Sequence, residues 1–296
     1  MFSTEDFIIA VFCCVDDLWN QLTQGKKIRK GGFAPSVSDS EIITMEIVGE
    51  FLGIETDKGI WHYFRDNWGS LFPKLKTRST FVRQAANLWQ YKQELQQLLA
   101  INLGGLADSI HLVDGFPIPL CHYQRARNCR LFMAEADFGY CAAKDEKYYG
   151  FHGHLLISAE GIITGFSLTA ANVSEREALW DLTTGIKGLL IGDKGYLSSS
   201  LQCDLSSQQI NLQTPKRSNM SDERPRHWVK LLLKTRRLIE TVIGQLVERF
   251  NIASVKARDL WHLTSRLHRK LLAHTVALWL NRHSDNPLCF RYLLSD

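Results

Sequence analysis

Residues 189–197 read Leu-Leu-Ile-Gly-Asp-Lys-Gly-Tyr-Leu, and this stretch is the best guide to the fold. Three apolar residues followed by Gly192 and Asp193 predict a buried strand that ends at a carboxylate. In α/β proteins, functional groups gather at the carboxyl ends of strands. Gly192 and Gly195 flank the acid, and glycine permits a sharp turn and the close approach of a ligand to the backbone. The next question is which other carboxylates the fold brings to Asp193.

The composition is that of a packed globular protein. The chain has 296 residues, 45% of them hydrophobic, which suffices for one large domain or two modest ones and excludes a disordered protein. The net charge of +4 says little by itself. The apolar start carries four acids by residue 17 and no apolar run approaches 18 residues, so we expect no signal peptide and no membrane span. Seven scattered cysteines without a Cys-x-x-Cys pair favour a reducing cytoplasm.

The first hundred residues are predicted to be helical. Apolar periodicity predicts helices over residues 5–24, 38–53, 57–68 and 79–99. Ser38 has Glu41 three residues later, the arrangement of a capping box. Residues 80–84 follow three basic residues, so they form either the recognition helix of a helix-turn-helix, with Arg83 directed at DNA, or an ordinary bundle helix with a charged face.

The pattern changes near Gly104-Gly105, which we take as a domain junction. This divides the chain into a helical N-terminal domain, residues 1–104, with an expected role in DNA binding, and a second domain, residues 105–296. Residues 110–117 read Ile-His-Leu-Val-Asp-Gly-Phe-Pro and predict a strand that ends at Asp114, followed by a turn. Asp114 is the first candidate partner for Asp193, although a lone Asp before Gly is also a common turn former.

The second domain mixes strands and helices. Residues 148–157 and 162–168 predict a β-hairpin, followed by a helix from Ser174 to about residue 186, the strand that ends at Asp193, a helix over 199–208 and a short strand over 210–213. This order places the chain in the α+β or α/β class. His152 and His154 would share one strand face, but no third soft ligand lies at a recognisable spacing, so zinc is disfavoured.

From Pro225 onward the chain is predicted to be helical and basic, with a last helix over residues 261–282. Basic residues outnumber acidic ones between 215 and 273, which suits a polyanion. Glu240 lies within a long apolar helix. Arg236 and Arg237 precede it by four and three residues and therefore neighbour it on the helix surface, and Gly244 one turn later leaves room for close approach.

Asp114, Asp193 and Glu240 form one candidate constellation. Hard oxygen ligands of this kind suit Mg²⁺ or Mn²⁺ rather than zinc. Two such ions, roughly 3.5–4 Å apart, can activate a water or a 3′-hydroxyl and stabilise the leaving oxygen in attack on a phosphodiester. The basic helix would then hold the DNA.

Three segments carry a resemblance to a known family. Residues 113–117 (Val-Asp-Gly-Phe-Pro), 192–196 (Gly-Asp-Lys-Gly-Tyr) and 236–246 (Arg-Arg-Leu-Ile-Glu-Thr-Val-Ile-Gly-Gln-Leu) resemble the three acidic motifs of bacterial insertion-sequence DDE transposases. The likeness is best to the insertion-sequence family numbered 982 and extends over nearly the whole chain. Each motif alone is weak, but the combination is specific.

This resemblance implies a mixed RNase H-like sheet flanked by helices, preceded by an all-helical N-terminal domain. It implies that Asp114, Asp193 and Glu240 are catalytic and bind two Mg²⁺ or Mn²⁺ ions. Such enzymes cut DNA at the terminal inverted repeats of the element and join the 3′-hydroxyl to target DNA. The residues expected to contact DNA are Lys194, Arg236, Arg237, Arg83 and Lys230, with Arg236 matching the family arginine four residues before the glutamate.

The expected partners are the element ends and target DNA, bound by a homodimer or a larger assembly in the bacterial cytoplasm, with the nucleoid and without a membrane. The chain departs from many relatives at Leu233 and Val247, where they carry tyrosine and lysine. The space between residues 214 and 226 is too short for the β-rich insertion of some relatives, so no hairpin pathway is inferred. Two alternatives remain open: a transposon-derived DNA-binding protein without catalysis, and a host nuclease of the same fold.

Overall fold

The computed structural model describes residues 2–141, 145–284 and 293. The chain forms two compact units, one made of Met1–Leu99 with Glu248–Asp296 and the other of Ala100–Val247. Among the described helices, none is both long and apolar enough to span a bilayer.

The first unit is helical, as predicted for the N-terminal region. Its helices are α1 (Thr4–Thr23), α2 (Asp39–Phe51), α3 (Asp57–Asn67), α4 (Arg78–Asn87), most of α5 (Trp89–Asn102) and α10 (Leu260–His283), with the 3₁₀ turn η3 (Ile252–Ser254). The capping box predicted at Ser38 is confirmed, because the Ser38 hydroxyl accepts from the Glu41 N–H while the Glu41 carboxylate accepts from the Ser38 N–H.

The continuous helix predicted over residues 79–99 is wrong, because the chain breaks at Leu88 into α4 and α5. At the break the Ala85 carbonyl accepts from the Lys92 ammonium at 3.0 Å and from the Ser265 hydroxyl at 3.1 Å. These buried side chains replace a helical hydrogen bond, so the carbonyl at the break stays satisfied.

The helix α10 belongs to this unit, whereas the predicted boundary grouped it with the sheet. The reason lies in buried carboxylates on α2 and α3 that need cationic partners. Arg269 of α10 is fully buried and pairs with Glu50 and with Asp57, the latter at 2.7 Å. Lys270 pairs with Glu50 at 2.7 Å. The chain therefore uses its last described helix to neutralise its second and third.

The second unit is built on a six-stranded mixed sheet, which confirms the predicted architecture. Its strands are β1 (Ile110–His122), β2 (Asp137–Cys141), β3 (Glu146–Ser158), β4 (Ile163–Ala170), β5 (Gly188–Ile191) and β6 (Ile210–Gln213). The order is β2-β3-β1-β5-β6, with β4 also paired to β3. The ladders β1–β5 and β5–β6 are parallel, and those made by β3 are antiparallel.

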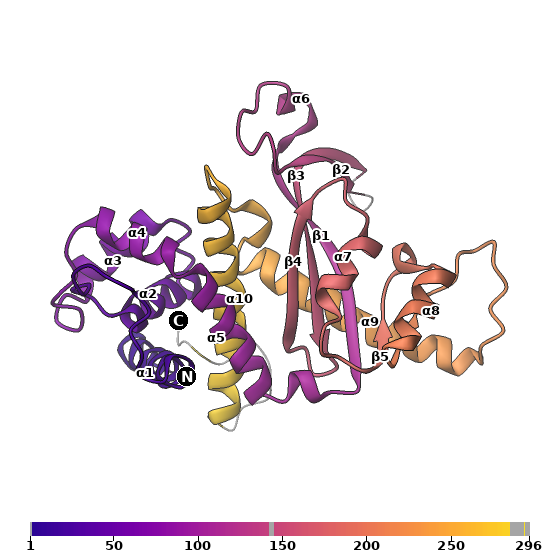
Figure 1. The fold of residues 1–296 in the computed structure, drawn as a ribbon, viewed down its shortest axis with the longest axis horizontal. Coiled ribbons are helices and arrows are strands. Elements are labelled where there is room, and N and C mark those ends of the chain that lie inside the picture. The colour runs from indigo at the N-terminus through magenta and orange to yellow at the C-terminus, as the bar shows by residue number, and fades with distance from the viewer. Residues whose placement is uncertain (1, 142–144, 285–292, 294–296) are drawn as a thin grey trace. The chain divides into compact units, whose positions relative to one another are not determined.

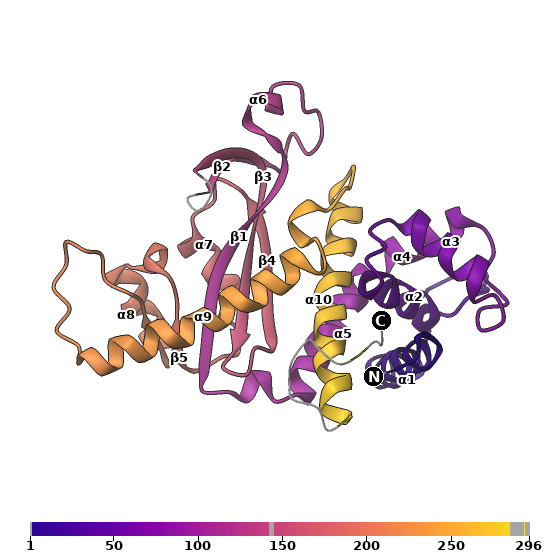
Figure 2. The same ribbon diagram turned by 180° about the vertical axis from the view of Figure 1, so that it is seen from behind.

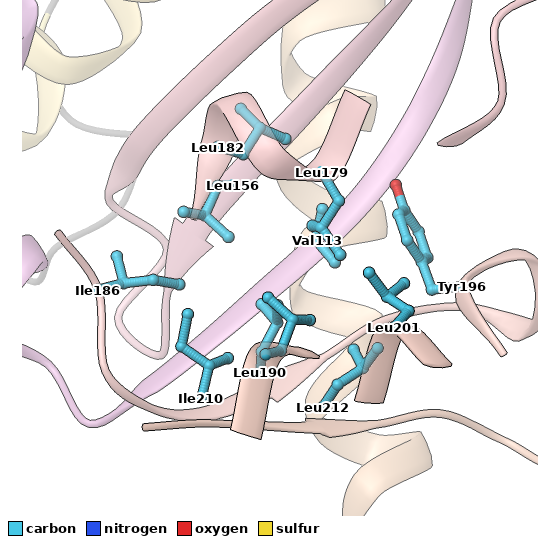
Figure 3. Close-up of a cluster of buried hydrophobic side chains, with 11 residues drawn as sticks. Val113, Leu156, Leu179, Leu182, Ile186, Leu190, Tyr196, Leu201, Ile210 and Leu212 are labelled. Atoms are coloured by element: carbon cyan, nitrogen blue, oxygen red, sulfur yellow. The ribbon is translucent and has the colours of Figure 1, made fainter. Parts of the chain in front are cut away.

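Helices cover both faces of this sheet. The helices of this unit are α7 (Glu175–Leu182), α8 (Ser199–Ser207) and α9 (Arg226–Glu248), with 3₁₀ turns η1 (Gly105–Ala107) and η2 (Lys194–Tyr196), while the short α6 (Tyr123–Ala126) lies in the loop after β1. The two ribbon views show α9 crossing one face of the sheet and α7 on the opposite face (Figures 1 and 2). On the α7 face, side chains from the sheet, α7 and α8 form a buried apolar cluster (Figure 3).

Strand β1 continues eight residues beyond Asp114, where the sequence predicted a turn. Its parallel partner β5 ends opposite Leu112, so from there on one edge of β1 has no β5 neighbour. The Gly115 N–H bonds to the Asp114 carboxylate and therefore faces that edge. Backbone nitrogens alternate between the two edges of a strand, so the nitrogens of Pro117 and Pro119 face the same edge as that of Gly115. These prolines, which have no N–H, therefore remove no hydrogen bond from the ladder to β3.

Candidate active site

The strand register brings Asp114 and Asp193 together. In the parallel ladder Leu112 lies opposite Ile191, and each aspartate follows its strand's paired residue by two positions. Both acids therefore lie at the same level, just beyond the end of the shared ladder, with Asp114 still within β1 and Asp193 after the end of β5. The convergence arises where the short strand β5 ends beside the longer β1, at the carboxyl end of their parallel ladder.

Arg236 connects these two acids to Glu240. Its guanidinium lies 3.5 Å from the Asp114 carboxylate, 3.7 Å from Asp193 and 3.1 Å from Glu240, one turn later on α9. One cation thus contacts all three carboxylates. The structure accordingly assembles the sequence-predicted acids into one cluster, with Asp114 on β1, Asp193 after β5 and Glu240 on the helix that crosses the sheet.

The three acids differ in exposure. The side chain of Asp114 is 15% exposed, that of Asp193 39% and that of Glu240 52%. Burial raises the pKa of Asp114 to about 6, and the charge of Asp193 adds to this, while the Gly115 N–H and Arg236 oppose it. Asp114 is therefore the acid that gains most from a cationic partner.

A fourth carboxylate, Glu175, lies at the same place, and the sequence interpretation missed it. Burial, together with the charges of Asp114 and Asp193 and against the opposing charge of Arg236, raises the pKa of Glu175 to about 7. Its neighbour Arg176 donates from Nε to the Gly195 carbonyl at 2.9 Å, which ties the start of α7 to the segment after Asp193. The available signal was weak, because a glutamate in the first turn of a helix is common for helix-dipole reasons alone.

His152 and Tyr196 border the same region. The His152 Nε2 lies 3.9 Å from a Glu175 oxygen, and burial lowers the pKa of His152. His154 stacks on His152 and bonds to Thr169 at 2.9 Å. Tyr196 is fully buried, and burial, followed by the charges of Glu175, Asp114 and Asp193, raises the pKa of its hydroxyl. His152 and His154 thus take part in the strand packing beside the acids.

The remaining residues predicted to contact DNA are exposed and lie outside the acid cluster. Lys194 is on η2, and Lys230 and Arg237 are on α9. Arg83 is exposed on α4 of the other unit, while the adjacent Gln84 is buried and bonds to Val37 and Asp39. Their contact with DNA stays a prediction.

A basic cavity lies beside the site. It measures about 890 Å³ and its lining includes Arg176, Lys216, Arg217 and Arg224. Arg224 is held by Asp222 and by the Thr214 carbonyl. The segment 214–226 thus presents cationic side chains next to the strand that carries Asp193.

The donor chemistry of the cluster fits a hard divalent cation, since carboxylates from three elements already converge on the Arg236 guanidinium. Within the described ranges, no three His, Cys, Asp or Glu side chains have the geometry of a formed metal site. Asp114, Asp193 and Glu240 are the residues that could hold the ion, and they are the ones now paired with Arg236.

Comparison with known proteins fits this geometry. The sequence profile described as "Transposase DDE domain" matches residues 104–260, more than half of the chain. The chain belongs to this family. The matched region contains Asp114 on β1, Asp193 after β5 and Glu240 on α9. No curated protein matches the sequence significantly.

The fold is also that of a solved transposase. The structure described as "Cryo-EM structure of piggyBac transposase synaptic complex with hairpin DNA" matches with a TM-score of 0.50 and 8% identity, over 98% of this chain and 77% of that one. At this identity the likeness concerns the fold. The predicted RNase H-like mixed sheet with an N-terminal helical region is thereby confirmed.

Proposed function

We propose that this protein is an active DDE transposase that binds the terminal inverted repeats of an insertion sequence, cleaves DNA and transfers the strand to target DNA. The observation that carries the proposal is the convergence of Asp114, Asp193 and Glu240 on one guanidinium at the edge of an RNase H-like sheet. The assignment to insertion-sequence family 982 rests on the three motifs quoted above.

The acids would bind a divalent cation next to the scissile phosphate. Mg²⁺ or Mn²⁺ bound there would activate the attacking hydroxyl and stabilise the leaving oxygen. Arg236 offsets part of the negative charge of the carboxylates in the free protein and, once released from them, would bind a DNA phosphate. The cavity lined by Lys216, Arg217 and Arg224 offers further phosphate contacts next to Asp193.

The expected DNA partners are the element ends and the target, with Lys194, Arg237, Lys230 and Arg83 as further contacts. Assembly as a homodimer or larger complex would place two element ends together. Each of these contacts is a surface charge, so their combined effect should appear as a steep dependence of affinity on salt.

The test uses the purified full-length protein, Mg²⁺ and DNA carrying the two ends of its own element. D114N, D193N and E240Q should each abolish nicking and joining, a loss beyond the roughly 10–100-fold caused by changes that only orient metal ligands. DNA affinity should persist, because phosphate contacts are made by other side chains. Asp181, exposed on α7, supplies the control D181N, which should cleave as the wild type does.

The products distinguish the alternatives. Joined products with short target duplications support transposition. Hydrolysis without joining would favour a nuclease, and DNA binding with no cleavage by the wild type would favour a DNA-binding protein without catalysis.

A further inference from the structure

The start of α7 is fixed against the segment that carries Asp193. The Arg176 guanidinium donates to the Gly195 carbonyl at 2.9 Å, and Glu175 precedes Arg176 in the first turn of the helix. The Glu175 side chain is 30% exposed, so it is largely buried but still accessible to solvent.

Two glycines show where the Glu175 carboxylate lies. A Cβ at Gly115 would stand 3.4 Å from its Oε1, and a Cβ at Gly195 would overlap its Oε2. Gly115 directly follows Asp114, and Gly195 lies two residues after Asp193. The carboxylate is therefore lodged between the two segments that carry the strand-end acids, and any larger residue at Gly195 would displace it.

Tyr196 provides an independent observation. Its side chain is fully buried, and among the described residues its hydroxyl has no hydrogen-bond partner. The ring packs against the apolar cluster while the hydroxyl points away from Leu201 and Leu212 (Figure 3). The charges acting on it come from Glu175, Asp114 and Asp193. Buried hydroxyls are normally paired, so an unpaired one within the electrostatic reach of these carboxylates indicates a site that takes a polar ligand.

We propose that Glu175 is a fourth carboxylate of the catalytic site and binds the divalent cation together with Asp114 and Asp193. This inference rests on the proposed transposase function and extends it to a residue on α7. Carboxylates on β1, after β5 and at the start of α7 would then hold the ion.

A simpler role for Glu175 would be to stabilise the helix start. Acidic residues in the first turn interact favourably with the helix dipole. Glu177 has the same benefit, being in the same turn, but it is exposed. The two glutamates therefore form a matched pair, in which only Glu175 faces Asp114 and Asp193.

The experiment measures Mn²⁺ binding to the full-length protein by electron paramagnetic resonance of free Mn²⁺, without DNA. E175Q should bind Mn²⁺ about 10-fold or more weakly than the wild type, in line with losses at metal sites. E177Q should bind as the wild type does. Circular dichroism checks folding, and E175D serves if E175Q does not fold, since its shortened carboxylate should also weaken binding.

A loss of Mn²⁺ affinity in E175Q no larger than that in E177Q overturns the inference. D114N and D193N separate this result from the proposed function. If these two variants lose Mn²⁺ binding and cleavage while E175Q keeps its affinity, only the role of Glu175 fails. If D114N keeps both Mn²⁺ binding and cleavage, the proposed transposase chemistry fails as well.

Discussion

Glu175 couples the protonation of a single side chain to the stability of the fold. Its pKa is raised to about 7 in the folded protein from the ordinary 4.5, first by burial and then by Asp114 and Asp193. As the pH falls from 8 to 5, the folded state takes up a proton that the unfolded state does not bind. The free energy of unfolding contributed by this residue therefore rises as the pH falls.

We expect the difference in unfolding free energy between wild type and E175Q to grow in favour of the wild type by roughly 1–2 kcal/mol from pH 8 to pH 5. Urea unfolding with a metal chelator present measures it. The pH dependence of the unfolding free energy of E175Q measures the contribution of the other titrating groups, including the buried histidines. A difference that stays constant with pH would contradict the raised pKa.

At the residue scale the sequence identifies Asp114, Asp193 and Glu240, because each stands out in an otherwise apolar strand or helix. It does not identify Glu175, since nothing local separates it from any first-turn glutamate. The glycines next to the acids mark the places where other side chains of the protein come close to the backbone. Gly195 was interpreted as space for a ligand, whereas a Cβ there would overlap the protein's own Glu175, and one at Gly192 would lie 2.9 Å from Tyr196.

Among the elements, α9 contains a glycine that the fold does not require. A Cβ at Gly244 would meet nothing within 4 Å. Because glycine inside a helix is destabilising by roughly 0.5–1 kcal/mol relative to alanine, G244A should raise the free energy of unfolding by that amount in urea denaturation.

The same substitution at Gly161 serves as a control, because there alanine should have the opposite effect on stability. Gly161 lies in the β3–β4 turn with φ +82°, a conformation that strains other residues, so G161A should destabilise the protein. Destabilisation by G244A would show that α9 packs more closely at this position than the structure indicates. A gain in stability with weaker DNA binding would support the expected approach of DNA along this face.

Element types follow from the sequence better than element ends do. Periodicity locates α1, β5, α8, β6 and α10 closely. Periodicity fails where contacts between distant residues set the end of an element. Strand β1 can contain two prolines because β5 stops at Ile191 and leaves that edge of β1 unpaired. Helix α4 ends where Lys92 and Ser265 bind the Ala85 carbonyl. The short strand β2 was not predicted, since its ladder to β3 depends on long-range pairing.

On the scale of the whole molecule, the buried charges of the helical unit should dominate its stability. Arg269 is fully buried and pairs with carboxylates from α2 and α3. R269M removes one cation from a buried network in which Glu50 keeps Lys270 and Asp57 keeps Arg266, and should cost about 3–5 kcal/mol. Thermal and urea unfolding measure this loss.

The matched control is R258M, because Arg258 is exposed, and a surface substitution of this kind should change stability by less than about 0.5 kcal/mol. Equal effects of R269M and R258M would contradict a role for the buried network. Cleavage activity distinguishes effects on the two units, because the three acids Asp114, Asp193 and Glu240 all lie in the unit Ala100–Val247.

The helical unit joins both ends of the chain, and this has a consequence during synthesis. A ribosome releases Glu50 and Asp57 long before it releases Arg269 and Lys270, at about 5–20 residues per second. For on the order of ten seconds the early helices carry carboxylates whose cationic partners do not yet exist, while the middle segment 100–247 can already fold. The part of the chain made first is thus completed last, and a nascent chain halted before α10 would expose unfinished helices to proteases and chaperones.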